Sequence, residues 1–299
     1  MPIRSTPVLL ASLLLAAGAR ADDLNPLHLG PSPELTLEQP PGTQPRQRSW
    51  ELPPVVVAGQ APASLREEDH VGSYGQPRWT ASRRFPSTRV YVIPEGKVEV
   101  EAWARDTISR DDGSEWRLLQ EVEIGLPHRF QLDLYLRQDY DTTSEDTLWG
   151  GQFEVRWALA DWGRIWGNPT LYFEYLALED RPDKIEPKLL LGGQIAPGWH
   201  WGANLVLEFE LSGQREHEYQ LTGAVSRTIV DEKFSLGLES IVTATDVQGS
   251  RADFDTAWFL GPSIQWRPLP NWTINLAPLF GITGESPAAQ IYFNTGWEF

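Results

Sequence analysis

The last twelve residues, AAQIYFNTGWEF (288–299), place apolar and polar side chains on opposite sides of one extended segment. One side carries Ile291, Phe293, Trp297 and Phe299, and the other is largely polar. An alternation of period two predicts a β-strand with a single apolar face. Because chain termini normally fray in water, a terminal Trp-Glu-Phe predicts an apolar medium against this strand, which is either a protein interior or lipid.

The composition limits the classes of protein to which the chain can belong. It contains no Cys, which excludes disulfides, thiolate metal ligands and the acceptor of a lipoprotein anchor. The formal net charge of -16 disfavours nucleic acid as a partner. Beyond the N-terminus there is no apolar run of about 18 residues, so a helical membrane protein is excluded.

The N-terminus, MPIRSTPVLLASLLLAAGARADD, has the layout of a secretory signal peptide. Arg4 provides the positive start, residues 8–17 provide a short apolar core, and Ala19-Arg20-Ala21 provides a small-x-small cleavage site. A buried N-terminal helix is the alternative. We expect residues 1–21 to be removed after Ala21 and the chain to be exported.

Two further segments precede the regular part of the chain. Residues 22–65 are rich in Pro, and repeated Pro removes backbone donors, which predicts a disordered linker. Residues 66–94 form a basic segment, in which positions 70–94 hold no acidic residue. We expect this segment to act as a plug or constriction at an acidic barrel, and a solvated linker is the alternative. The basic residues of positions 70–94 are Arg78, Arg83, Arg84 and Arg89.

From residue 95 onward the period of two recurs in segments of ten to fourteen residues. In RFQLDLYLRQDY (129–140), Leu132 and Leu134 alternate with Asp133 and Tyr135. The pattern predicts twelve strands, near 97–106, 115–126, 129–140, 148–158, 169–179, 186–196, 199–212, 216–227, 232–244, 255–267, 271–283 and 288–299.

The length and the connections of these strands favour a membrane barrel over a soluble sandwich. Strands of globular proteins usually have about five or six residues, whereas a tilted strand needs about 9–11 to cross a bilayer. The connections alternate between long acidic loops, such as TISRDDGSE, and compact turns, such as LPHR and APGW. Bacterial outer-membrane barrels show this asymmetry. A Trp-rich glycan-binding sandwich is the alternative.

Aromatic residues gather near both sets of connections, as in the two girdles of a membrane barrel. The set near the compact turns is Trp157, Trp162, Trp166, Trp199, Trp201, Trp266, Trp272 and Trp297. The set near the long loops is Trp116, Tyr140, Trp149 and Trp258.

Hydrocarbon offers no partner to an exposed sheet edge, so the sheet must close and the last strand must pair with the first. We therefore predict an all-β fold, a monomeric antiparallel transmembrane barrel over residues 95–299 with outer-membrane lipid around it. The residues of the terminal strand, ending on Phe299, resemble the signal by which the barrel assembly machinery recognises its substrates.

The segments PEGKVEVEAW, GLPHRFQLDLYL, EVRWALADWGRIWGNPTLYFEY and FNTGWEF carry a wider resemblance. Over residues 90–299 the chain resembles the MetA-pathway phenol-degradation family of outer-membrane proteins, whose members are also called transporters. The resemblance implies an outer-membrane location and a transport role, and it identifies no substrate.

The predicted register points a charged set of side chains into the lumen. Carboxylates of this set would favour cations or neutral polar solutes, or they would pair with Arg105, Arg137, Arg156 and Lys188 and simply fill a narrow barrel. The width of a twelve-stranded barrel is intermediate, so both alternatives stay open. The set is Glu99, Glu101, Glu121, Glu123, Asp133, Arg137, Glu154, Arg156, Glu174, Lys188, Glu208, Glu210, Glu218 and Glu239.

Other chemistry finds little support in the sequence. None of the five His residues belongs to a Gly-x-Ser-x-Gly or His-Glu-x-x-His motif, and there is no phosphate-binding Gly loop. We therefore expect no catalytic residues, no cofactor and no bound metal. Passage of an unidentified small solute is the predicted function, a closed structural or surface-interaction barrel is the alternative, and an outer-membrane hydrolase is the third possibility.

Overall fold

The computed structural model describes residues 66–213, 215–249 and 253–299. The predicted signal peptide (1–21) and the Pro-rich linker (22–65) lie outside these residues. All the described residues belong to one compact unit. None of them forms a helix that is long and apolar enough to cross a membrane.

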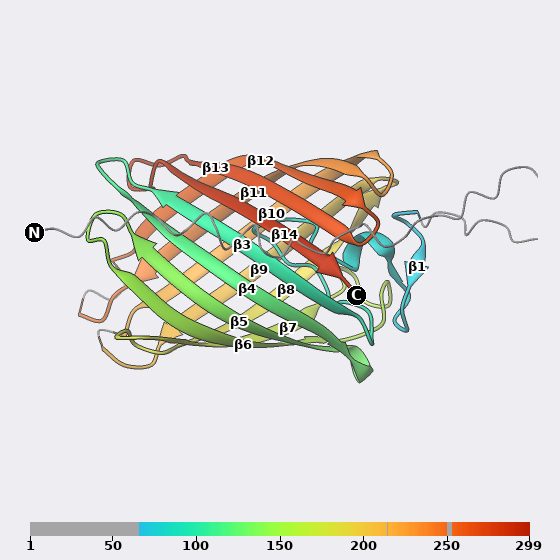
Figure 1. The fold of residues 1–299 in the computed structure, drawn as a ribbon, viewed down its shortest axis with the longest axis horizontal. Helices are drawn as coiled ribbons and strands as arrows, with labels where there is room; N and C mark the ends of the chain where they lie inside the picture. Colours follow the sequence, from blue (N-terminus) through green and yellow to red (C-terminus); the bar gives the residue numbers. More distant parts are fainter. Residues whose placement is uncertain (1–65, 214, 250–252) are drawn as a thin grey trace, which may run out of the picture. The chain divides into compact units, whose positions relative to one another are not determined.

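Twelve antiparallel strands of the described chain close into a barrel, which confirms the predicted fold (Figure 1). Their order around the barrel is their order in the sequence. The strands are β3 (Val98–Ile108), β4 (Ser114–Leu126), β5 (Phe130–Asp141), β6 (Thr147–Ala158), β7 (Thr170–Leu178), β8 (Lys184–Ala196), β9 (Trp199–Glu210), β10 (His217–Val230), β11 (Phe234–Asp246), β12 (Asp255–Leu269), β13 (Trp272–Gly281) and β14 (Ala289–Glu298).

The ring closes where β14 pairs with β3. Trp297 lies opposite Val100 and Phe293 lies opposite Ala104 in an antiparallel register. Every strand therefore has two neighbours, and no row of backbone N–H and C=O groups is left without partners at an edge. A sheet without edges is the form of β-structure that hydrocarbon tolerates.

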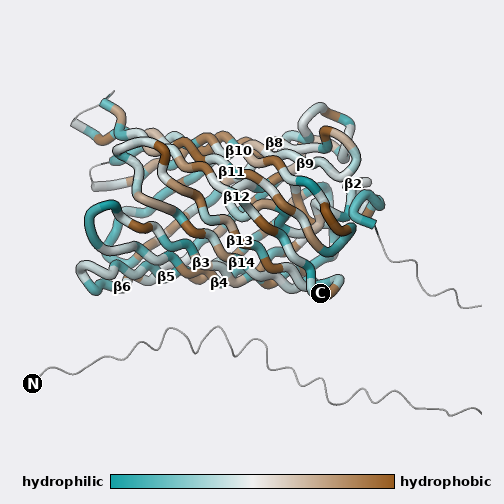
Figure 2. The backbone as a smooth tube through the Cα atoms, turned by 90° about the horizontal axis from the view of Figure 1, so that it is seen from above, coloured by the Kyte–Doolittle hydropathy of each residue, from teal (hydrophilic) through white to brown (hydrophobic). Residues whose placement is uncertain are grey.

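Hydrophobic and hydrophilic residues follow one another along the tube of the barrel (Figure 2). The burial of their side chains shows that the two faces of the sheet differ in the way the alternation predicts. On β5, Leu134 and Leu136 point outward and are exposed, whereas Asp133 points into the lumen and is buried. On β14 the same outward face carries Trp297 and then Phe299, which is 68% exposed. The side that the sequence analysis assigned to lipid is thus the outer side of the barrel, and Ile291 and Phe293 lie half-buried on it.

The strands have nine residues at the shortest, in β7, and fifteen at the longest, in β12. Each can therefore span a bilayer at the usual tilt. β10, β11 and β12 each extend two or three residues past their predicted ends. The tight reversals after β10 and β12 continue the pairing beyond the point where the alternation in the sequence becomes irregular.

The two ends of the barrel are named here by their connections. The inner end carries the C-terminus and five turns, and the outer end carries the other connections. Four of the inner turns have two or three residues, and they are 127–129, which form the short helix η4 (Pro127–Arg129), 197–198, 231–233 and 270–271, while the fifth, 159–169, has eleven. The described residues of the outer loops are 109–113, 142–146, 179–183, 211–213 with 215–216, 247–249 with 253–254, and 282–288.

Candidate functional site

Residues 66–97, which we call the lumen segment, enter the barrel at the inner end and return to it before β3 begins. The backbone N–H of Glu67 donates to Asp231 in an inner turn, at 3.0 Å. The segment then reaches the middle of the barrel, where the N–H of Arg89 donates to Asn204 on β9, at 2.9 Å. It contains β1 (His70–Val71), β2 (Gln76–Pro77) and the short helix η3 (Arg78–Thr80).

An apolar cluster anchors the lumen segment against the barrel wall. Trp79 and Phe85 are fully buried, and they belong to one cluster with Tyr91. The ring of Trp162, from the turn between β6 and β7, meets Trp79 edge-on at 5.6 Å and Tyr91 at 5.2 Å. Trp162 was predicted to belong to an aromatic girdle, and that prediction is wrong, because its turn folds inward over the lumen segment.

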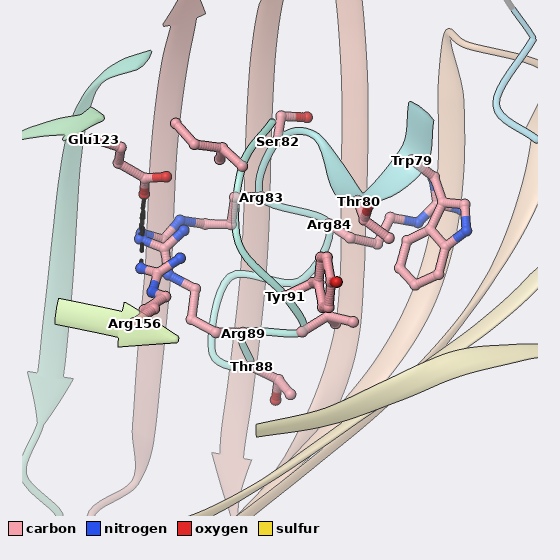
Figure 3. Close-up of a pocket in the computed structure, with 12 residues that line it drawn as sticks. Trp79, Thr80, Ser82, Arg83, Arg84, Thr88, Arg89, Tyr91, Glu123 and Arg156 are labelled. Carbon is pink, nitrogen blue, oxygen red and sulfur yellow. Dashed lines mark hydrogen bonds and ion pairs between the residues drawn. The ribbon is translucent and has the colours of Figure 1, made fainter. Parts of the chain in front are cut away.

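Two guanidinium groups of the lumen segment lie among three carboxylates of the barrel wall. Figure 3 shows one of these carboxylates, Glu123, beside Arg83 and Arg89. Arg83 Nη2 is 2.6 Å from Glu101 and 3.1 Å from Glu121. Arg89 Nη2 is 2.8 Å from Glu121 and 2.6 Å from Glu123. All three carboxylates are almost completely buried. Charges buried to this degree need such partners, because water no longer solvates them.

Arg78 holds the lumen segment to the rim of the inner end. Its guanidinium pairs with Glu298 on β14, at 2.6 Å, and with Glu232, at 3.3 Å. It also donates to the carbonyl oxygen of Pro270, at 2.7 Å. The segment is therefore bonded to the last strand and to two inner turns, which lie far from it in the sequence.

Arg84 points to the other side of the lumen, where it pairs with Glu67 at 2.7 Å and donates to Ser226 at 2.9 Å. Burial of the guanidinium lowers the pKa of Arg84 to about 10, and the carboxylate of Glu67 opposes that shift. Burial likewise raises the pKa of Glu67. Both charges belong to the lumen segment and are poorly solvated, so each depends on the other.

His200 lies beneath the lumen segment and is completely buried. Its Nδ1 is 3.1 Å from Arg84 and 3.3 Å from Glu67, and its ring lies 4.4 Å from the Trp79 ring, centroid to centroid. The sequence indicated only that His200 follows a turn. Its contacts are with residues more than a hundred positions away in the sequence, which no local pattern reveals.

The remaining predicted lumen residues point into the barrel and fall into separate groups. Arg156 pairs with Asp133 at 2.9 Å and with Glu154. Arg137 pairs with Asp139 at 2.6 Å. Lys188 pairs with Glu174 at 3.6 Å and with Glu186, and Lys184 pairs with Glu208 at 2.6 Å and Glu210 at 3.9 Å. Glu239 accepts from the N–H of Ser87, at 2.9 Å, and Glu218 lines the cavity described below.

The outer half of the lumen is hollow. A cavity of about 470 Å³ lies beyond the tip of the lumen segment, and Pro86 and Ser87 are part of its lining. A second cavity, of about 360 Å³, lies nearer the outer loops, beside Asp141 and Arg181. The larger one is walled by charged and polar groups, which include Arg105, Arg117, Glu186, Glu208 and Gln220. Arg105 forms no ion pair with any other described residue.

A pair of glycines makes room for the lumen segment. Gly192 on β8 lies directly opposite Gly202 on β9. A Cβ on Gly202 would lie 3.0 Å from the Cγ2 of Thr88 and 3.1 Å from that of Val90. Glycine inside a strand often marks a close approach of another backbone. These two glycines are therefore the signal in the sequence that could have located the segment.

Carboxylates in the inner half approach one another closely enough to hold a cation. One group is Glu101, Glu121 and Glu123, and a second is Glu121, Asp133 and Glu154. Each group already contacts a guanidinium, of Arg89 or Arg83 in the first and of Arg156 in the second. In this state the protein's own arginines take the positions that a cation would take.

Residues 179–299 match the model of a family described as "Putative MetA-pathway of phenol degradation". This is the family that the sequence resembles over residues 90–299. No curated protein is similar enough to match the chain.

Several solved structures are similar to this chain. An outer membrane channel from Pseudomonas putida F1 has 9% identity and a TM-score of 0.51, with 70% of this chain and 98% of that chain covered. The NanC porin has 13% identity and a TM-score of 0.48, covering 68% and 98%. The KdgM porin has 11% identity and a TM-score of 0.46, covering 67% and 99%. The chain is therefore a twelve-stranded β-barrel with the fold of an outer-membrane channel, and over residues 179–299 it matches the phenol-degradation family.

Proposed function

We propose that the protein is an outer-membrane channel for small hydrophilic solutes, and that the lumen segment is its removable constriction. One observation carries the proposal: the segment fills the inner half of the lumen, while the outer half holds a polar cavity of about 470 Å³. A barrel built only for structure would have no use for a large chamber lined by charged side chains.

The location follows from the same proposal. Export through the signal peptide (1–21) would bring the chain to the periplasm. The barrel assembly machinery would then recognise the last strand through Ile291, Phe293, Trp297 and Phe299. The outward apolar face of that strand supports this role, since lipid and the assembly machinery both contact the outside of a barrel.

Conductance in planar lipid bilayers tests the channel. We expect removal of residues 66–94 from the mature protein to raise single-channel conductance several-fold, because a twelve-stranded barrel without a segment inside it has room for a water-filled passage. Migration in detergent electrophoresis before boiling controls for a folded barrel. Unchanged conductance in a folded deletion variant would contradict the constriction.

A closed structural barrel is the second candidate, and the tight packing of the lumen segment favours it. Trp79 and Phe85 are fully buried, and Arg83, Arg84 and Arg89 all pair with carboxylates. Such a barrel would keep the segment in place permanently and pass no current as the full-length mature protein, whereas removal of residues 66–94 would open a passage that the intact protein never uses. Absence of current from the full-length protein at every voltage and solute tested, together with current through the deletion variant, would therefore select it.

A further inference from the structure

Seven carboxylates form one unbroken row across seven neighbouring strands of the barrel. Each lies directly opposite the next in the register of the sheet, so all seven point into the lumen. Side chains that are directly opposite have Cβ atoms about 4.5–5.5 Å apart. The opposed pairs are Glu298–Glu99, Glu99–Glu123, Glu123–Asp133, Asp133–Glu154, Glu154–Glu174 and Glu174–Glu186.

The row climbs from one end of the barrel to the other. Glu298 is the last residue of β14, at the inner end, whereas Glu186 is the third residue of β8, at the outer end. The climb follows from the tilt of barrel strands, because a line drawn across tilted strands rises along the barrel axis. Glu174 and Glu186 line the large cavity, where Glu208 and Glu218 form a further opposed pair.

Positive charge on the barrel wall matches only part of this row. From the wall itself, Arg156 reaches Asp133 and Glu154 and, at 3.9 Å, Glu123, and Lys188 reaches Glu174 and Glu186. The lumen segment provides the other cations: Arg78 on Glu298, with Arg83 and Arg89 at Glu123. The row therefore depends on positive charges that a separate segment of the chain brings into the lumen.

The carboxylate of Glu99 has no ion-pair partner among the described residues even with the lumen segment in place. Its side chain is 1% exposed, and neither of its carboxylate oxygens has a hydrogen-bond partner among the described residues. It lies in the row between Glu298 and Glu123. One oxygen of Glu101, next to the row, is also buried without a partner. An unpartnered buried carboxylate is costly, so this position favours an additional cationic group.

We propose that the carboxylate row is a binding track for linear polyamines, and that the arginines of the lumen segment occupy it in their absence. A polyamine carries ammonium groups along a flexible chain, separated by a few methylene groups, and can place successive charges on successive carboxylates. The lumen segment itself is a linear polycation bound in this way. The proposal rests on the proposed channel function and specifies its solute.

The outer cavity gives a polyamine access to the row. Its ammonium groups would first meet Glu174, Glu186, Glu208 and Glu218, and the next carboxylates inward are Glu154 and Asp133. Further advance brings it to Glu123, which Arg89 holds at 2.6 Å. Competition for Glu123 would release Arg89 and with it the tip of the lumen segment, so the solute would open its own passage.

A single engineered cysteine measures this release, because the chain has no Cys of its own. Ser87 lies at the tip of the segment, where its hydroxyl contacts Glu239. In the full-length mature S87C protein we expect spermidine to raise the rate of labelling by a thiol reagent several-fold. Butylamine and sodium chloride at the same ionic strength should leave the rate nearly unchanged. The exposed loop variant S109C should label rapidly under all conditions.

Two carboxylate variants test the track directly through block of the current by spermidine. In the channel that lacks residues 66–94, we expect E174Q/E186Q to weaken the block about tenfold or more, because two charge-assisted contacts are lost. The control D111N/E285Q removes two exposed loop carboxylates and should leave the block unchanged.

The deletion variant separates the two proposals: absence of current contradicts the channel, whereas current that spermidine does not block contradicts only the polyamine track. Equal labelling of S87C in spermidine and in matched salt would likewise overturn the track.

Discussion

At the scale of single residues, the lumen is organised by which partner each buried charge has. Arg83 and Arg89 share Glu101, Glu121 and Glu123, and all five side chains have little contact with water. A buried ion pair contributes modest net stability, but removal of one partner leaves the other charge buried alone. Docking of the lumen segment is therefore most sensitive to single substitutions at these positions.

We predict that R89Q loosens the lumen segment while the barrel remains folded. The loss of one partner from a buried pair costs about 3–5 kcal/mol, and amide exchange in an opening segment accelerates accordingly. Hydrogen exchange of the amides around Ser87 should thus become faster by a factor of about 100 or more, measured against the amides of β11. The matched control is R66Q, since Arg66 is exposed in the same segment. Equal protection in R89Q and R66Q would refute the sensitivity of this pair.

At the scale of elements, β8 and β9 form the part of the barrel wall against which the lumen segment packs. Gly192 and Gly202 are opposed there, and Val90 and Thr88 occupy the space that side chains would fill. A strand that keeps glycine at this point loses side-chain packing within the sheet. The loss is offset by the close approach of a second part of the chain.

We predict that G202L displaces the lumen segment. The three atoms nearest to a Cβ at residue 202 all belong to the lumen segment, in Thr88, Val90 and Phe85. Overpacking of this kind costs about 1–3 kcal/mol, and the segment can relieve it by moving whereas the sheet cannot. Single-channel conductance should rise toward that of the variant without residues 66–94. G223L is the control, because a Cβ at residue 223 meets no atom within 4 Å, and a rise of equal size in both variants would disprove the mechanism.

At the scale of the whole molecule, the protein is a closed barrel with a second part of the same chain inside it. The ring of twelve strands closes through pairing of β14 with β3, and no residue of the lumen segment takes part in that pairing. We therefore expect closure of the ring and occupancy of the lumen to be separable in a variant.

Electrophoresis in detergent should show this separation. We predict that both the mature protein and the variant without residues 66–94 migrate faster before boiling than after it, because a closed barrel stays compact until heat separates its strands. Identical migration of the unboiled and boiled mature protein would argue against a closed barrel. A mobility difference lost only in the variant would show that the ring needs the segment.

The strands and their lumen-facing positions could be predicted because they depend on the pattern of apolar and polar residues within each strand. Alternation along a strand sets which side chains share a face, so Glu99 and Glu101 are assigned together with no knowledge of neighbouring strands. The apolar face of residues 288–299 likewise indicated closure of the ring. Trp162 was misassigned for a related reason: an aromatic residue in a turn can face lipid or lumen, and alternation does not extend into turns.

The sequence by itself determined a twelve-stranded barrel, the charged character of its interior, and a basic segment ahead of it. Only the tertiary structure decided which charges meet: Arg89 with Glu123, Arg84 with Glu67, and Glu99 with no partner. The same holds for the carboxylate row. Its continuity depends on how far each strand is shifted against the next, and that shift is fixed by closure of the whole ring, which no single strand encodes.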